Sequence, residues 1–160
     1  MKRALKTLTN ALPVFVLLLA CVAGSDSFAG ENYLSDGQPI VVAHGKARAL
    51  GRLGFRYENG LGVPQNYIAA VDLYRRAAEQ GDAFAQSRLG LSYDKGHGVR
   101  QDFILAYKWL DLAAARASRR ERDFYARLRD AVASKISLAE VTEGQRLALT
   151  WTANREAKRY

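Results

Sequence analysis

The sequence predicts an all-α fold, a solenoid of paired helices. The main observation is an internal repeat, because residues 53–80 align without a gap on residues 89–116 at an offset of 36. Apolar residues also recur with the 3.6-residue period of an α-helix, and a glycine-rich loop returns in both copies. A repeat length in the thirties is typical of arrays in which each unit is a helix pair.

The two copies are identical at eleven of 28 aligned positions. The identical pairs are Leu53/Leu89, Gly54/Gly90, Tyr57/Tyr93, Gly60/Gly96, Gly62/Gly98, Val63/Val99, Gln65/Gln101, Ile68/Ile104, Ala70/Ala106, Ala77/Ala113 and Ala78/Ala114. Because only two full copies are present, any groove along the array should be short.

The first repeat, about residues 47–82, predicts two helices joined by a tight loop. The first helix spans residues 46–59, where apolar residues recur on one helical face. Gly60 suits the left-handed residue that closes such a helix. Asn66 can accept hydrogen bonds from the first free amides of the second helix, which runs to about Gln80.

The second repeat, about residues 83–118, copies this plan. Its helices are expected at residues 83–95 and 103–115, with Asp102 as the cap of the second. A glycine inside a helix costs about 1 kcal/mol relative to alanine. Gly54 and Gly90 are such glycines at equivalent positions, so we expect a tight helix crossing at both.

A third unit, residues 119–153, departs from the repeat. Two capping helices are expected at about residues 119–134 and 138–153. The pairs Ser118/Glu121 and Ser137/Glu140 have the spacing of capping boxes at their starts.

The third unit is expected to cover the apolar face that a helical array leaves open at its end. Trp151 of the last helix should bury against Phe124 or Leu128 of the helix before it. Removal of the last helix would then expose that face.

The segment before the first repeat, residues 30–42, is interpreted as a tether with a short helix, and the repeat domain as residues 43–155. Residues 39–44 are expected to be the stub of a separate helix. Gly45 occupies the place of Gly81 in the next repeat (81 − 36 = 45) and should end that stub.

The first 29 residues read as an export signal peptide. Three basic residues precede an apolar run of 13 residues, 11–23, which is too short to span a bilayer as a stable anchor. Small residues at Ser27 and Ala29 then supply a cleavage site before Gly30. The expected location is periplasmic or secreted.

Cys21, the single cysteine of the sequence, leaves a second route open. Residues 18–21 resemble a bacterial lipobox, in which the cysteine is acylated and becomes the mature N-terminus. The protein would then be lipid-anchored in the envelope. Cleavage after Ala29 would instead remove the cysteine, so the mature chain would have no disulfide or thiol chemistry. A short membrane-anchoring helix is a third interpretation.

The formal net charge is +8 at pH 7. The leader contributes +2, from three basic residues minus one acidic residue, which leaves +6 for the rest. A basic surface suits acidic partners of many kinds. Because of the export signal, no nucleic-acid partner is expected.

The repeat motifs resemble a known family. The first copy carries Leu53, Gly54, Tyr57, Gly60, Leu61, Gly62, Val63, Ala70, Tyr74, Ala77 and Ala78; the second carries Leu89, Gly90, Tyr93, Gly96, His97, Gly98, Val99, Ala106, Trp109, Ala113 and Ala114. These residues resemble the Sel-one-like repeat, a branch of the tetratricopeptide superfamily. The closing stretch from Arg129 to Trp151 is also similar, and the resemblance covers about residues 43–151.

That resemblance implies a right-handed superhelix of paired helices. It also implies a role in protein–protein interaction and in the assembly of complexes, in bacteria often in the envelope. In such superhelices the first helix of each pair lines the concave side. The aromatic residues Tyr57, Tyr74, Tyr93 and Trp109 are interpreted as packing residues.

Four arginines are the candidate partner-binding residues. Arg48, Arg52 and Arg56 recur at i, i+4 and i+8, opposite the apolar face of the first helix, and Arg88 is the equivalent of Arg52. The resemblance implies that they lie in the groove; an ordinary solvated helix face is the alternative. A second basic run, residues 116–122, is interpreted as surface.

No catalytic constellation is evident. His44 and His97 each lie beside a glycine at an expected turn without a partner at helical spacing, so no metal site is predicted. Glu58 and Asp94 are equivalent carboxylates that could act as an acid and a base; two exposed helix-end charges are the simpler interpretation. No nucleophile, phosphate-loop or dinucleotide motif is present, and no cofactor is expected.

The predicted function is that of an exported, non-enzymatic bacterial envelope protein. It would bind a protein or peptide of acidic character through its short groove, and the oligomeric state is left open. The alternative is an envelope hydrolase that acts on cell-wall material. A desolvated Glu58 or Asp94 beside another ionisable group would favour this alternative.

Overall fold

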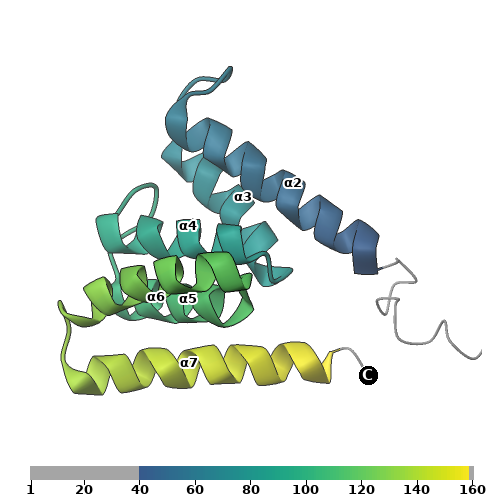
Figure 1. Ribbon diagram of the computed structural model, residues 1–160. Coiled ribbons are helices and arrows are strands. Elements are labelled where there is room, and N and C mark those ends of the chain that lie inside the picture. Colours follow the sequence, from purple (N-terminus) through teal and green to yellow (C-terminus); the bar gives the residue numbers. More distant parts are fainter. Residues whose placement is uncertain (1–39, 159–160) are drawn as a thin grey trace, which may run out of the picture. The chain divides into compact units, whose positions relative to one another are not determined.

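The computed structural model describes residues 40–158 (Figure 1). Within this range the chain forms six α-helices and no strand, so the predicted all-α fold is confirmed. The helices are α2 (Ile40–Asn59), α3 (Tyr67–Glu79), α4 (Ala83–Lys95), α5 (Phe103–Arg116), α6 (Arg119–Ala133) and α7 (Leu138–Ala157). The predicted signal peptide, Cys21, the start of the tether and the side chain of His44 lie outside the described residues.

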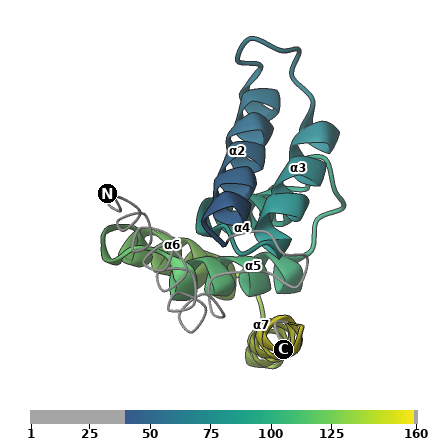
Figure 2. The ribbon, with the colours of Figure 1, turned by 90° about the vertical axis from the view of Figure 1, so that its right-hand side faces the viewer.

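The two repeats are two helix pairs. Helix α2 packs against α3, and α4 packs against α5 (Figure 2). Contacts between α3 and α4 join the first pair to the second, and α5 in turn packs against α6. Each helix therefore buries one face against its neighbour in the pair and another against the adjoining unit, as in a solenoid.

Side-chain caps fix the starts of three helices, including the predicted caps Asn66 and Asp102. The Oδ1 atoms of Asn66, Asp82 and Asp102 accept hydrogen bonds from backbone amides three residues later, at 2.9, 2.8 and 2.9 Å. At the other end of α4, Gly96 takes a left-handed conformation with φ of 72°. The cap and loop residues thus occupy the same places in both repeats.

Both expected tight crossings are present. A Cβ atom on Gly54 would lie 2.8 Å from the ring of Tyr74 and 3.1 Å from the carbonyl oxygen of Ala70. A Cβ atom on Gly90 would lie 2.8 Å from Leu110 and 3.0 Å from the carbonyl oxygen of Ala106. Since the second helix of each pair lies directly over the glycine of the first, a larger residue cannot fit without displacement.

Aromatic and aliphatic side chains form the core between these crossings. Tyr74 and Leu110 are fully buried, and Trp109 is nearly so. Tyr57 and Tyr93 pack half-buried against the same core. The interpretation of the repeated aromatic residues as packing residues is confirmed.

Helix α2 begins earlier than expected. Residues 40–44 are continuous with the first repeat helix and do not form a separate stub, so the predicted break at Gly45 is wrong. Gly45 is not among the glycines with positive φ, and a Cβ atom there would meet nothing within 4 Å. A glycine alone weakens a helix but does not end it unless the backbone turns away.

One of the two expected capping boxes forms. Ser137 accepts from the backbone amide of Glu140, and the Glu140 carboxylate accepts from the amide of Ser137 at 2.8 Å. At the start of α6, Ser118 makes no side-chain cap bond to the backbone, and its hydroxyl donates to Glu121 Oε2 at 2.7 Å instead. The capping box predicted at Ser118 is therefore wrong, although the Ser137 hydroxyl makes the same bond to its glutamate at 2.7 Å within a complete box.

The last two helices cover the end of the second repeat, but through contacts other than the expected ones. Trp151 packs edge-on against Trp109 of α5, with ring centroids 5.9 Å apart, and Phe124 remains 51% exposed. Helices α6 and α7 each pack mainly on α5. The close fit of Gly144 against Tyr107 aligns α7 with α5, since a Cβ atom on Gly144 would lie 2.8 Å from the Tyr107 ring. The predicted burial of Trp151 against Phe124 or Leu128 is therefore wrong.

Among the described helices, none has the length and apolar character needed to cross a membrane.

Candidate partner-binding site

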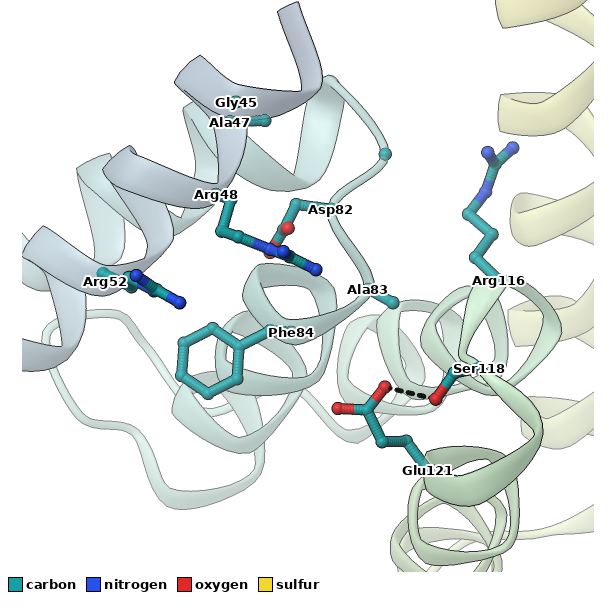
Figure 3. A pocket seen from close by; sticks show the side chains of 11 residues that line it. Gly45, Ala47, Arg48, Arg52, Asp82, Ala83, Phe84, Arg116, Ser118 and Glu121 are labelled. Atoms are coloured by element: carbon teal, nitrogen blue, oxygen red, sulfur yellow. Dashed lines mark hydrogen bonds between the residues drawn. The ribbon is translucent and has the colours of Figure 1, made fainter. Parts of the chain in front are cut away.

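An open hollow of about 850 Å³ lies between α2, the turn from α3 to α4 and the turn from α5 to α6 (Figure 3). One wall is the N-terminal half of α2, the base is the turn from α3 to α4, and the other wall is the turn from α5 to α6. The lining residues are Gly45, Ala47, Arg48, Arg52, Gly81, Asp82, Ala83, Phe84, Arg116, Ser118 and Glu121.

Arg48 and Arg52 form the basic wall of the hollow. They lie one helical turn apart on α2, and both guanidinium groups extend into the space beside Phe84 (Figure 3). Both side chains are exposed, and neither forms an ion pair with another described residue. Helical spacing predicted that Arg48 and Arg52 share one face of α2, and in the structure both side chains line one hollow.

Phe84 supplies an apolar surface at the base. It lies in the first turn of α4 with 36% of its surface exposed, held edge-on between the rings of Phe55 and Tyr74 at 6.1 and 6.5 Å. The sequence analysis did not single out Phe84. The repeat offset could have found it, because it is the equivalent of Arg48 (48 + 36 = 84).

The hollow also contains acidic groups. Asp82 Oδ1 is bound to the amide of Ala85 as the cap of α4, and Asp82 lines the base of the hollow (Figure 3). Glu121 lies on the opposite wall, where the Ser118 hydroxyl binds its Oε2 atom. Among the lining residues, the basic side chains Arg48 and Arg52 therefore lie on α2, and the acidic side chains lie in the base (Asp82) and on the opposite wall (Glu121).

Arg116 lines the hollow only with its stem. Its guanidinium points toward α7 and lies 4.9 Å from the ring centroid of Trp151 (Figure 3). The neighbouring Arg119, Arg120 and Arg122 are exposed on α6. Within the basic run 116–122, Arg116 thus contacts an aromatic ring, whereas the other three arginines lie on the surface of α6.

The other two candidate arginines have partners within the chain. Arg56 Nε donates to the carbonyl oxygen of Leu61 at 2.9 Å, so its side chain folds back over the loop that follows α2. Arg88 binds Glu58 Oε2 through Nε at 3.0 Å and Nη2 at 2.5 Å, and lies 5.2 Å from the ring centroid of Phe55. Neither residue lines the hollow.

The Arg88–Glu58 pair belongs to a network across three helices. The Tyr74 hydroxyl donates to the same Glu58 oxygen at 2.5 Å. Burial, together with this hydrogen bond, raises the pKa of Tyr74. Burial alone would lower the pKa of Arg88, but its hydrogen bonds to Glu58 and Tyr74 raise it. The network therefore joins a charged pair with a neutral phenol, linking α2, α3 and α4.

The interpretation of Glu58 and Asp94 as two exposed helix-end charges is wrong. The Glu58 side chain is only 20% exposed, and that of Asp94 is 13% exposed and binds Lys135 at 2.6 Å. Each carboxylate is already engaged by a cation of another helix or turn, and neither lines the hollow. A desolvated carboxylate beside another ionisable group is the arrangement that the sequence analysis named as favouring the hydrolase alternative, and in both cases the neighbouring group is a cation that pairs with the carboxylate.

No metal-binding cluster is evident in the described part of the chain. No three histidine, cysteine, aspartate or glutamate side chains come together there. The ring of His97 stacks on Tyr67 with centroids 4.7 Å apart. This contact joins the loop of the second repeat to the start of α3.

Comparison with known proteins identifies the repeats. The family model of the Sel1 repeat matches residues 47–82 and 83–118. No curated protein matches the sequence. Sel1 repeats are generally protein-interaction modules, which supports a protein partner for this chain.

One solved structure shows the same kind of fold, and a second one matches a shorter part of the chain. A protective antigen present in uropathogenic Escherichia coli strains, which displays an SLR fold, matches 69% of this chain with a TM-score of 0.62 and 29% identity. A Sel1 repeat protein from Oxalobacter formigenes matches 43% of this chain with a TM-score of 0.43 and 45% identity. The matches cover 23% and 28% of those two chains. Residues 47–82 and 83–118, at the centre of this chain, are therefore similar to two Sel1 repeats.

Proposed function

We propose that this protein binds an acidic peptide segment of a partner protein in the hollow and does not catalyse a reaction. The observation that carries the proposal is the pairing of Arg48 and Arg52 beside Phe84. Two guanidinium groups without an ion pair among the described residues face one open space with an exposed aromatic ring. A segment with carboxylates next to an apolar side chain complements this surface in charge and polarity.

Arginine suits this role because its planar guanidinium can donate two parallel hydrogen bonds to one carboxylate. An exposed ion pair contributes only about 0–1 kcal/mol, so useful affinity requires both arginines and the apolar contact together. Binding should weaken as salt rises, because screening acts over about 8 Å at physiological ionic strength.

Of the four candidate arginines, Arg48 and Arg52 are assigned the direct contacts. Arg56 and Arg88 hold the loop after α2 and the crossing of α2 with α4, and thereby support the wall that carries the other two. The engagement of Arg88 with Glu58 supports this division, because breaking that pair would leave a carboxylate that is 20% exposed without its cation.

We also propose that the protein acts outside the cytoplasm, in the periplasm, as a secreted protein or as a lipid-anchored envelope protein. The proposal rests on the basic, apolar and small-residue order of the first 29 residues. Mass spectrometry of the mature protein tests it. A chain that begins at Gly30 indicates signal cleavage, and fatty-acid labelling that is lost in Cys21→Ser indicates a lipoprotein. A mature chain that still begins at Met1 would contradict both.

The binding proposal is tested with purified residues 30–160 as bait in an envelope extract. The double variant Arg48→Glu/Arg52→Glu should lose partners that the wild type retains. The matched control is Arg100→Glu/Arg127→Glu, which changes the net charge equally at two exposed arginines outside the hollow. The control should retain those partners.

Circular dichroism should show equal helicity for the three proteins, because all four arginines are exposed. Equal loss of partners in both double variants would show that net charge, and not the hollow, determines binding. Undiminished binding by Arg48→Glu/Arg52→Glu would overturn the proposal.

A further inference from the structure

We infer that the segment bound in the hollow carries a basic side chain beside its acidic one, and that Glu121 recognises the basic group. This inference rests on the proposed function and adds to it the chemistry of the opposite wall. The site would thus take a segment of mixed charge with an apolar centre, and not a uniformly acidic one.

Glu121 is held in place as a receptor for a cation. It lies in the first turn of α6, and its carboxylate extends into the hollow across from the α2 arginines (Figure 3). The Ser118 hydroxyl donates to Oε2 at 2.7 Å, which fixes the side chain. A carboxylate has about four lone-pair sites, so one hydroxyl leaves most of its accepting capacity free.

No ion pair of Glu121 is present among the described residues. The adjacent Arg120 and Arg122 form no ion pair with it, because consecutive residues on a helix point in different directions. The guanidinium of Arg116 lies over Trp151. Within the described residues, Glu121 therefore forms no internal salt bridge, although three arginines lie within two residues of it in the sequence.

The positions of the charged side chains in the hollow then predict the order of acidic, apolar and basic side chains in the bound segment. Carboxylates are favoured along α2 by Arg48 and Arg52, whereas Glu121 repels a carboxylate and favours an ammonium or guanidinium group. Phe84 lies in the base between the two walls and can contact an apolar side chain (Figure 3). An acid–apolar–base order matches all three surfaces at once.

The test uses two fluorescein-labelled synthetic peptides and fluorescence anisotropy. The mixed-charge peptide has two aspartates, two central leucines and two lysines, spaced by alanine; the acid-only peptide has alanine in place of both lysines. They are titrated with wild-type residues 30–160, with Glu121→Gln, which can still accept from Ser118, and with Asp123→Asn. Asp123 is an exposed acidic residue of α6 that does not line the hollow.

Wild-type protein should bind the mixed-charge peptide up to about fivefold more tightly than the acid-only peptide, the ratio expected for one exposed ion pair. Glu121→Gln should remove this preference, and Asp123→Asn should keep it. A preference that is absent from the wild type, or unchanged in Glu121→Gln, overturns the inference. If both peptides still bind and both are lost in Arg48→Glu/Arg52→Glu, the proposed function stands without it. Failure of the wild type to bind either peptide would contradict both.

Discussion

Arg155, in the last turn of α7, donates a hydrogen bond from Nη2 to the carbonyl oxygen of Gln80, 75 residues earlier in the chain, at 2.5 Å. Gln80 is the C-cap of α3, where a positive charge is favoured by the helix dipole. The same guanidinium lies 5.4 Å from the ring centroid of Trp151. Helix α7 is therefore attached to the end of the first repeat as well as to the second.

This contact predicts a strong effect of Gly81→Ala. Gly81 has φ of +84°, and a Cβ atom there would overlap the Arg155 guanidinium. The left-handed conformation alone should lower the free energy of unfolding by about 1–2 kcal/mol. Gly45→Ala is the matched control, because its Cβ atom meets nothing within 4 Å and a helical alanine should stabilise by up to about 1 kcal/mol. Urea denaturation measures both; equal stability of the two variants would contradict the prediction.

The tight crossings predict that Gly54→Ala and Gly90→Ala each destabilise the fold. Each added Cβ atom would lie within 3.1 Å of a backbone carbonyl oxygen of the partner helix, so relief requires the helices to separate. Overpacking of this kind costs about 1–3 kcal/mol. Thermal denaturation should show a lower Tm for both variants. A Tm at or above that of the wild type would mean that the crossing is looser than described.

The contact of Trp151 with Trp109 predicts that α7 contributes to stability through one face. Trp151→Ala removes an aromatic pair and the ring on which two arginines lie, and should cost about 2 kcal/mol or more. Leu149→Ala on the same helix is the control, because Leu149 is 72% exposed and its loss should change stability by less than about 0.5 kcal/mol. Equal effects in urea denaturation would contradict the described packing of α7.

The raised pKa of Tyr74 predicts a loss of stability in alkali. Above the ordinary value of 10.0 the unfolded chain releases the Tyr74 proton while the folded chain keeps it. The unfolded state then binds fewer protons, so the free energy of unfolding should fall by about 1.4 kcal/mol per pH unit from this residue. Tyr74→Phe should show a shallower decline than the wild type above pH 10 in urea denaturation at each pH. Identical slopes would show that Tyr74 ionises as readily in the folded state.

The repeated part of the fold could be predicted because its information is local and occurs twice. Asn66 and Asp102 have the residue types that cap helices, and Gly54 and Gly90 mark the crossings at one offset. The third unit has no second copy. The positions of α6 and α7 depend on non-local contacts such as Trp109 with Trp151 and Gly144 with Tyr107, which no period in the sequence records.

The site could be predicted only in part for the same reason. The four-residue spacing of Arg48 and Arg52 predicted directly that both side chains lie on the same face of the helix. The engagement of Arg88 by Glu58 depends on how α2 crosses α4, so helical spacing could not reveal it. Glu121 lines the hollow because the turn between α5 and α6 positions the start of α6 there. The repeat pattern ends at this turn, so the sequence could not predict that position.

The network of Glu58, Tyr74 and Arg88 also specifies the order of the two repeats. At the offset of 36 its members correspond to Asp94, Leu110 and Phe124, which cannot make the same bonds because a leucine and a phenylalanine replace the phenol and the guanidinium. A permuted chain with the repeats exchanged would keep its helix lengths, loops and caps. Glu58 and Tyr74 lie in one repeat and would move together, whereas the new junction would join Asp94, Leu110 and Arg52 and would lack the phenol. The order of the two repeats therefore determines whether the junction between them contains the phenol.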